Sequence, residues 1–346
     1  MSKTRIGYFF SVLVASLAVL FVFSAIEPAH AQRKSIRWAT SSTGSYGYRV
    51  AAQMVKVLED ALGGQYTVTV NPYPSTTAAM KATMDGDAEI GYTADVGMDE
   101  VYTNEGAFKD YKPAKSKMVH TWYAYPMESF MAVYAPKVGQ FKSWGDFSGK
   151  PVFFTPAGFM NWLNFKRIYK ALGYQFKHVQ IGEANQGDAL QAGTIVGAVC
   201  YTTAGRSLPS YWRETELRLD IKIINPSQDE IKKLTAANLA PAELDATKIF
   251  SKDVGVKTIL GVPLLFGYNV LADMPEEVVY KMLTKFNAER ENLAKADPGF
   301  EPMARDFVGM QVKGINANPT IPVHVGLAKF LKEHKVWNDK WKIAGR

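Results

Sequence analysis

Three hydroxyl-rich segments hold the residues of this sequence best suited to bind a small molecule. Small residues there let a ligand approach the backbone, and the free N–H groups at the start of a helix suit a carboxylate or a phosphate. Taken alone, each segment could equally be a plain helix cap made by Ser, Thr or Asp. The segments are 41–48 (SSTGSYGY), 73–77 (YPSTT) and 92–95 (YTAD), and their predicted ligand contacts are Thr43, Gly44, Ser45, Tyr46, Tyr48, Ser75, Thr76, Thr77, Tyr92 and Asp95.

A second group of candidate ligand residues follows a strand-like run later in the chain. These residues are Tyr201, Thr202, Thr203 and Arg206. We predict that Arg206 binds a carboxylate with both arms of its guanidinium group, because the planar fork matches that anion. The alternative is a solvent-facing arginine at the start of a helix, since most arginines are exposed.

Phe159 and Asn161 complete the predicted binding set. An apolar wall at Phe159 favours a ligand with a carboxylate and an apolar or aromatic body. The helical spacing of residues 159, 162, 163 and 166 leaves another interpretation open, in which Phe159 and Trp162 face the core instead.

Local catalytic signatures are absent from the sequence. There is no G-x-S-x-G, H-E-x-x-H, Walker A or G-x-G-x-x-G motif, and the histidines at 120, 178, 324 and 334 are widely spaced. We interpret these histidines as structural. The single cysteine, Cys200, excludes an intrachain disulfide and a cysteine-based metal cluster, and its apolar neighbours predict a buried side chain. The expectation is a protein that is not an enzyme and has no cofactor. No residue is assigned as a metal ligand, and whether a metal ion assists ligand binding stays open.

Composition is that of an ordinary globular protein. The chain has 346 residues, of which 47% are hydrophobic and 21% charged, so two domains are the natural expectation. Its net charge of +7 favours acidic partners. The lysine-rich stretches near residues 109–117 and 332–342 are typical of solvated helix faces, so no nucleic-acid partner is expected.

The N-terminus has the features of a secretory signal peptide. Lys3 and Arg5 precede an apolar stretch, and Ala29-His30-Ala31 provides a cleavage pattern, so residues 1–31 are predicted to be removed. The expected location is the periplasm. The apolar stretch is also long enough for an uncleaved membrane anchor, which is the alternative.

Strand-like and helix-like segments alternate along the rest of the chain. The first half predicts strands at 35–40, 65–71 and 89–93 and helices at 48–62, 76–84 and 96–103, which is typical of a mainly parallel sheet covered by helices. The pattern then begins again, and the last 75 or so residues are predicted to be helical. The later predicted strands are 119–125, 129–134, 151–155, 177–180, 194–201, 220–224 and 257–271, and the later helices are 159–172, 183–191, 228–235, 275–295, 301–308 and 323–334.

Several motifs, in this order, resemble the TAXI family of solute-binding proteins, which serve TRAP (tripartite ATP-independent periplasmic) transporters. The resemblance covers essentially the whole chain after residue 31. The motifs are 42–48 (STGSYGY), 74–76 (PST), 86–90 (GDAEI), 146–150 (DFSGK) and 322–327 (PVHVGL). The chain departs from the family pattern at Ser45, at 157–161 (AGFMN) and at Gly197-Ala198, so ligand identity stays open.

The resemblance implies an α/β fold of the two-lobed, type II periplasmic-binding-protein class, with two strand crossovers between the lobes. Lobe one is expected at 32–125 plus 262–346, and lobe two at 126–261. The implied function is a monomeric receptor that captures a small organic carboxylate between its lobes and delivers it to TRAP membrane subunits. A secreted enzyme or a periplasmic ligand sensor on the same scaffold remains an alternative.

Overall fold

The first part of the chain alternates strands and helices, as its hydrophobic periodicity predicts. The computed structural model describes residues 33–345, so the predicted signal peptide and its cleavage site lie outside the described residues. From Ser35 onward the chain forms one compact unit. Its first elements are β1 (Lys34–Thr40), α2 (Tyr46–Ala61), β2 (Tyr66–Pro72), α3 (Thr76–Asp85), β3 (Ile90–Ala94), α4 (Asp95–Thr103) and β4 (Met118–Val119).

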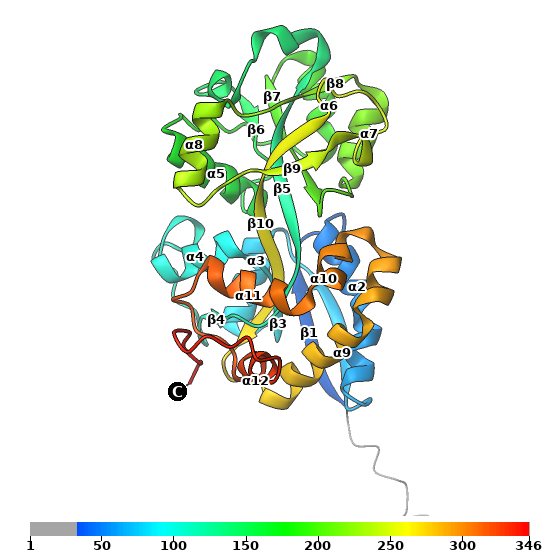
Figure 1. Ribbon diagram of the computed structural model, residues 1–346, viewed down its shortest axis with the longest axis vertical. Coiled ribbons are helices and arrows are strands. Elements are labelled where there is room, and N and C mark those ends of the chain that lie inside the picture. Colours follow the sequence, from blue (N-terminus) through cyan, green and yellow to red (C-terminus); the bar gives the residue numbers. More distant parts are fainter. Residues whose placement is uncertain (1–32, 346) are drawn as a thin grey trace, which may run out of the picture. The chain divides into compact units, whose positions relative to one another are not determined.

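Two long strands, β5 (Tyr123–Tyr134) and β10 (Thr258–Leu271), connect two groups of elements (Figure 1). They pair with each other in antiparallel fashion from Val262 to Gly267. The sheet has the order β2-β1-β3-β10-β5-β7-β6, with parallel β1–β3 and β6–β7 pairs. We call β1–β4 with α2–α4 and α9–α12 lobe one, and β6–β9 with α5–α8 lobe two.

Lobe two is built from short strands and amphipathic helices. Helix α5 buries Leu163, Phe165 and Ile168 and ends at Gly173, which has a φ of +75°. The positive φ of that glycine suits the end of a helix. The elements of lobe two are β6 (Val152–Phe153), α5 (Met160–Leu172), α6 (Gln186–Ala192), β7 (Gly197–Thr203), α7 (Ser210–Arg218), β8 (Ile221–Ile224), α8 (Gln228–Ala236) and β9 (Ala242–Asp245).

The C-terminal helices return to lobe one. Helix α9 packs against α2 and α12, and α11 packs against β5 (Figure 1). A Cβ on Gly314 of α11 would overlap the ring of Tyr123, so this helix approaches β5 closely. The prediction that the last part of the chain is helical is confirmed. These helices are α9 (Glu276–Ala296), α10 (Glu301–Arg305), α11 (Phe307–Ala317) and α12 (Val325–Glu333).

Aromatic side chains fill much of the core on both sides of the long strands. In lobe one the Trp122 ring stacks on Phe286 with 4.4 Å between ring centroids. In lobe two Phe154 stacks on Phe176 at 4.1 Å. Cys200 is buried and free, as predicted.

The prediction of two strands on either side of Pro126 is wrong. One strand, β5, runs through Pro126, which pairs with Leu265 of β10. The register shifts by one residue just beyond this point, so the proline lies next to a bulge, where the lack of an N–H group is tolerated. The Pro126 carbonyl still accepts the N–H of Ala204.

Other differences concern element boundaries. The helix predicted at 301–308 is broken at Asp306, whose side chain caps the longer helix α11. The strand predicted at 177–180 is reduced to a single bridge between Val152 and His178. Helix α7 and strand β9 were not predicted, because their sequences (SYWRETELR and AELD) lack a clear apolar period.

Candidate functional site

The first predicted loop leads into α2. Ser45 is the N-cap of this helix, and its Oγ accepts the N–H of Tyr48 at 3.1 Å. Thr43 and Gly44 are exposed, and a Cβ added to Gly44 would meet no atom within 4 Å. The same loop therefore has two parts: Ser45 caps the helix, whereas Thr43 and Gly44 are accessible to a ligand.

The second predicted loop touches lobe two. Ser75 caps α3 by accepting the N–H of Ala78 at 3.1 Å. Thr77, in the first turn, donates its hydroxyl to the Gly158 carbonyl at 2.8 Å and its N–H to the same oxygen at 3.2 Å. Thr76 beside it is buried. A lobe-two carbonyl thus occupies the electropositive start of α3, where an anionic ligand group would also be favoured.

Asp95 also connects the two lobes. This residue begins α4, and its Oδ2 lies 3.1 Å from the Arg167 guanidinium of α5. Its Oδ1 accepts the N–H of Leu265 on β10 at 2.9 Å. The predicted ligand residue Asp95 therefore has partners on α5 and on a connecting strand.

Tyr46 and Tyr92 belong to a buried group of aromatic residues on the lobe-one side, which we call the tyrosine cluster: Tyr46, Tyr92, Tyr125 and Tyr268. The hydroxyls of Tyr92 and Tyr125 are 3.0 Å apart. The Tyr46 hydroxyl donates to Asp297 Oδ1 at 2.7 Å, and that of Tyr268 donates to the Gly47 carbonyl at 2.8 Å. Burial raises the pKa of all four, so they are neutral hydroxyl donors and acceptors at ordinary pH.

The predicted lobe-two residues approach this cluster from β7. Tyr201 is buried and pairs with Ser129 of the connecting strand β5. A Cβ on Gly299 would lie 2.8 Å from Thr203 Cγ2 and would overlap the Tyr46 hydroxyl. The fold thus brings Thr203 of lobe two close to Tyr46, which contacts Tyr125, the hydrogen-bond partner of Tyr92.

Arg206 and Thr202 are both held by carboxylates. The guanidinium group of Arg206 lies 3.1 Å from Glu301 of α10 in an ion pair between the lobes. Thr202 donates its hydroxyl to Glu128 of β5 at 2.7 Å. Glu128 also accepts the N–H of Gly205 at 3.0 Å, so it positions the loop that carries Arg206.

Phe159 and Asn161 lie at the start of α5, and Tyr48 lies in the first turn of α2. Phe159 is 8% exposed and is the N-cap residue of α5. The Asn161 Oδ1 accepts the Ser129 hydroxyl of β5 at 2.7 Å, so Asn161 faces a connecting strand. Trp162 is half-buried and packs against Phe176 and His178, and Tyr48 is half-buried.

Several residues at this interface were not singled out from the sequence: Glu128, Arg167, Asp297 and Glu301. Glu128 is the one with a recognisable signal, because it is a lone carboxylate inside the apolar run YAYPMESFMAVY. In the sequence, Arg167, Asp297 and Glu301 are indistinguishable from ordinary surface charges. Only the tertiary structure shows that each has an oppositely charged group or a hydroxyl as its partner.

Two of the histidines interpreted as structural are buried and hydrogen-bonded. The ring nitrogens of His120 lie 2.7 Å from the Tyr123 hydroxyl and 2.9 Å from the Asn318 carbonyl. Burial lowers the pKa of His120 to about 4, so its ring is neutral. His324 accepts the N–H of Gly326 at the start of α12.

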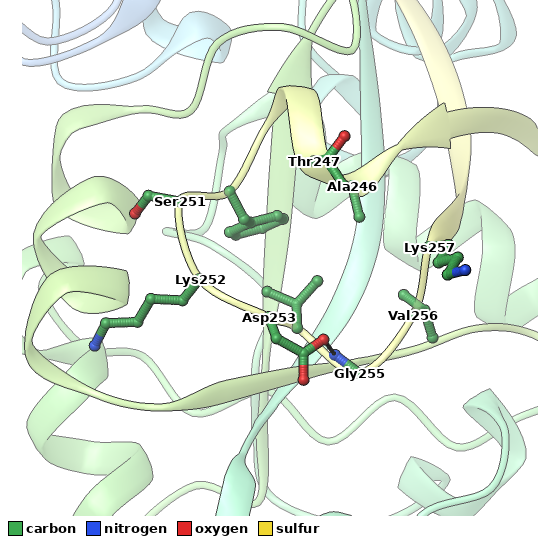
Figure 2. Close-up of a pocket in the computed structure, with 10 residues that line it drawn as sticks. Ala246, Thr247, Ser251, Lys252, Asp253, Gly255, Val256 and Lys257 are labelled. Carbon is green, nitrogen blue, oxygen red and sulfur yellow. Dashed lines mark hydrogen bonds between the residues drawn. The ribbon is translucent and has the colours of Figure 1, made fainter.

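A groove of about 860 Å³ borders Asp95 and lies between the two lobes. Its walls include Arg167 and Lys170 of α5 and Lys313 of α11. Figure 2 shows a different pocket, of about 580 Å³, formed by the loop between β9 and β10. That pocket holds none of the predicted ligand residues. Its Asp253 carboxylate is paired with Lys222 at 2.8 Å.

Within residues 33–345 no three His, Cys, Asp or Glu side chains gather in a way that could hold a metal ion. Over the same range, no helix is both long and apolar enough to cross a membrane.

Comparison with known sequences places most of the chain in one family. Residues 38–334 match the NMT1-like family. The chain belongs to the NMT1-like family. No curated protein matches this NMT1-like chain.

Solved structures resemble the NMT1-like protein in fold. A structure described as a periplasmic transporter has 14% identity and a TM-score of 0.50, and the alignment covers 83% of this chain and 96% of that one. The aliphatic sulphonate-binding protein SsuA of Escherichia coli has 13% identity and a TM-score of 0.46, with 87% and 79% of the two chains covered. A histidine kinase sensor domain similar to periplasmic binding proteins has 10% identity and a TM-score of 0.48, with 78% and 97% covered. The predicted α/β fold of the periplasmic-binding-protein class is confirmed.

Proposed function

We propose that this protein is an extracytoplasmic receptor that captures a small organic carboxylate between its lobes and delivers it to TRAP-type membrane subunits. The observation that carries the proposal is the meeting of predicted ligand residues from both lobes. Thr203 of lobe two lies close to Tyr46, next to Tyr92 in the tyrosine cluster, and two long strands connect the lobes that bear them. Such a connection allows the hinge motion by which two-lobed receptors close on ligands.

A carboxylate fits the polar groups on the lobe-one side. The helices α2 and α3 begin there with serine caps, and the Thr77 N–H and hydroxyl already bind a carbonyl oxygen. A negatively charged oxygen in place of the Gly158 carbonyl would bind these donors more strongly, because charge-assisted hydrogen bonds exceed neutral ones. The net charge of +7 also favours an anionic ligand.

The lobe limits and the cleavage site belong to this proposal. Lobe one would comprise 32–125 plus 262–346 and lobe two 126–261, with residues 1–31 removed on export to the periplasm. The N-terminal mass of the protein recovered from a periplasmic extract tests the cleavage, since the new terminus is expected at Gln32.

A thermal-shift and calorimetry screen of dicarboxylates, oxo-acids, amino acids and aromatic acids tests the ligand class. An acid at about one hundred times its Kd should stabilise the protein by about 2.7 kcal/mol. A response to bulky or aromatic acids is expected, with a weaker response to short dicarboxylates. If sugars or other uncharged solutes bind and no acid does, the carboxylate assignment is wrong.

A transport receptor and a sensor can be distinguished by the protein with which each one acts. A transport receptor should restore uptake of the identified acid by vesicles that contain TRAP membrane subunits. A sensor should leave uptake unchanged and instead alter the activity of a kinase, and an enzyme should convert the acid to a product. Turnover of the acid by the purified protein would therefore contradict the receptor assignment.

A further inference from the structure

Two methionine sulfurs from different lobes lie against the same glycine. A Cβ added to Gly97 of α4 would lie 2.7 Å from the sulfur of Met160 and 2.9 Å from the sulfur of Met80. Met80 belongs to α3 of lobe one, and Met160 is the first residue of α5 in lobe two. We call these two residues the methionine pair. None of the contacts described above uses it.

The methionine pair lies among the contacts that join the two lobes. Thr77, one turn before Met80 on α3, donates its hydroxyl to the carbonyl oxygen of Gly158. Gly158 in turn lies two residues before Met160. The ion pair between α4 and α5 joins the same two helices as Gly97 and Met160. A hinge motion that parts the lobes therefore also parts the two sulfurs.

Burial protects the methionine pair only while the lobes are in contact. Met80 is 0% exposed and Met160 is 1% exposed. Met54 and Met131 are also 0% exposed, but each is covered within one lobe. Met54 lies on α2, which packs against β2 and α9 of lobe one, and Met131 of β5 pairs with strands β7 and β8 of lobe two. Opening of the hinge thus exposes the pair and leaves the other two methionines buried.

The thioether groups of the pair can react with peroxides. The sulfur lone pair takes one oxygen atom from hydrogen peroxide, the O–O bond breaks, and the products are methionine sulfoxide and water. The sulfur loses two electrons and the peroxide gains them. A sulfoxide is polar, whereas the pair occupies a contact so close that one added carbon at Gly97 would overlap both sulfurs. An added oxygen should therefore prevent the lobes from packing together again.

We propose that Met80 and Met160 are a site of reversible oxidation that controls closure of the lobes. A peroxide reaches the methionine pair when the lobes part, and the sulfoxides then hold the protein open. Methionine sulfoxide reductases supplied with a dithiol remove the oxygen as water, oxidise the dithiol to a disulfide and restore the thioethers. This inference rests on the hinge motion of the proposed function and adds a control by oxidants.

Oxidation rates at single methionines test whether the pair is exposed by opening. The purified protein is treated with dilute hydrogen peroxide, and peptide mass spectrometry follows each sulfoxide. Met80 and Met160 should oxidise about tenfold or more faster than the equally buried Met54 and Met131, because opening governs access to buried groups. Equal rates at all four positions overturn the proposal.

A crosslink between the lobes provides a direct test of the role of opening. A Cβ added to Gly158 would lie 3.3 Å from the Cβ of Ser75, which is close to the separation in a disulfide. Ser75→Cys combined with Gly158→Cys should therefore form a disulfide that holds α3 against the loop before α5. Oxidation of the methionine pair should slow to the rate of Met54 in the crosslinked protein and stay fast in Ser75→Cys alone. If the crosslink leaves the rate unchanged, movement of the lobes is not what exposes the pair, and the proposal fails.

Small-angle scattering tests whether oxidation holds the lobes apart. The radius of gyration should rise when the wild type is oxidised and return to its initial value after treatment with the reductases. Met80→Leu combined with Met160→Leu keeps an apolar contact of similar volume without an oxidisable sulfur, so its radius of gyration should not change with peroxide. Met54→Leu combined with Met131→Leu is the matched control and should respond as the wild type does.

The outcomes separate this switch from the receptor proposal. An unchanged radius of gyration in the oxidised wild type overturns the switch, and so does an increase in the protein that carries Met80→Leu and Met160→Leu. A loss of secondary structure on oxidation, measured by circular dichroism, would identify the pair as a structural contact only and also overturns the switch. The acid screen uses unoxidised protein, so the receptor and the switch can fail independently.

Discussion

At the residue scale, the carboxyl groups of two residues determine the position of the loop after β7. Glu128 accepts hydrogen bonds from Thr202 and Gly205, and Glu301 pairs with Arg206. One carboxylate belongs to a connecting strand and the other to a lobe-one helix. The position of the Arg206 guanidinium therefore depends on residues from three separate elements.

Substitution at 206 and 301 tests whether Arg206 binds the ligand. If it does, Arg206→Ala should weaken binding of an organic acid by about tenfold or more, because a charge-assisted bidentate contact is lost. Glu301→Gln frees the guanidinium and should maintain or increase affinity. The ion pair is about one-third exposed at Arg206 (34%), so neither change should greatly alter the free energy of unfolding. Equal weakening by both variants, measured by calorimetry, would instead identify the pair as a contact that favours the closed lobes.

Glu128 should make stability depend on pH. Burial raises its pKa from 4.5 to about 7, so the folded protein holds a proton that the unfolded chain releases. The stabilisation that this proton gives the folded state is complete below pH 4.5 and is lost as pH rises through about 7. Glu128→Gln mimics the protonated form and should remove that loss, which is on the order of 3 kcal/mol.

Urea unfolding at several pH values between 5 and 8 gives the comparison for Glu128. The wild type should lose stability relative to Glu128→Gln as pH rises. Glu243→Gln, an exposed substitution on β9, should follow the wild type. Parallel curves for wild type and Glu128→Gln would show that Glu128 does not titrate in this range.

At the element scale, neighbouring helices and strands pack so closely that some contacts have room only for glycine. Helix α11 lies so near β5 that Gly314 has no room for a side chain against Tyr123. Gly91 of β3 is similarly crowded by Thr83 and Met118. Neither position therefore has room for a larger residue: Gly314 lies between α11 and β5, and Gly91 lies against α3 and β4.

Gly314→Ala should lower the free energy of unfolding by about 1–3 kcal/mol, because the added methyl group overlaps the Tyr123 ring. The loss should occur even though alanine favours a helix more than glycine does. Gly139→Ala is the matched control, since a Cβ there meets no atom within 4 Å. If urea unfolding shows Gly314→Ala to be as stable as the wild type, α11 is less tightly packed than described.

At the scale of the whole molecule, ion pairs and hydrogen bonds join lobe two to lobe one. Besides Arg206–Glu301, they include the Arg167–Asp95 ion pair and the hydrogen bonds from Thr77 to Gly158. They lie on different elements, yet each joins lobe two to lobe one. A ligand that displaces or replaces one of them shifts the balance between open and closed forms by its differential affinity.

Arg167→Met should weaken the closed form. It leaves the buried Asp95 carboxylate with the Leu265 N–H and without its cation, which costs about 1–3 kcal/mol. We expect a larger radius of gyration in small-angle scattering and faster amide exchange in α4 and α5. Arg218→Met removes an exposed ion pair with Asp188 within lobe two and should change neither quantity. An unaltered radius of gyration in Arg167→Met would mean that this pair does not control closure.

Local patterns sufficed for much of the fold and for part of the site. The apolar spacing of α2 and the alternation in β1 and β3 are read from neighbouring residues, and the serines at 45 and 75 cap helices as the sequence indicates. Pro126 misled the prediction, because a bulge that depends on β10 decides whether the strand continues. The ligand contacts proposed from the sequence remain predictions.

The sequence by itself determined the alternation of most strands and helices, the hydroxyl-rich loops between them and the burial of Cys200. Each of these follows from residues close together in the chain, through capping, periodicity and hydrophobicity. The tertiary structure alone decided that Asp95 meets Arg167 and that Arg206 meets Glu301. The partners in these two pairs are 72 and 95 residues apart, so their contact depends on how β5 and β10 place whole lobes against each other.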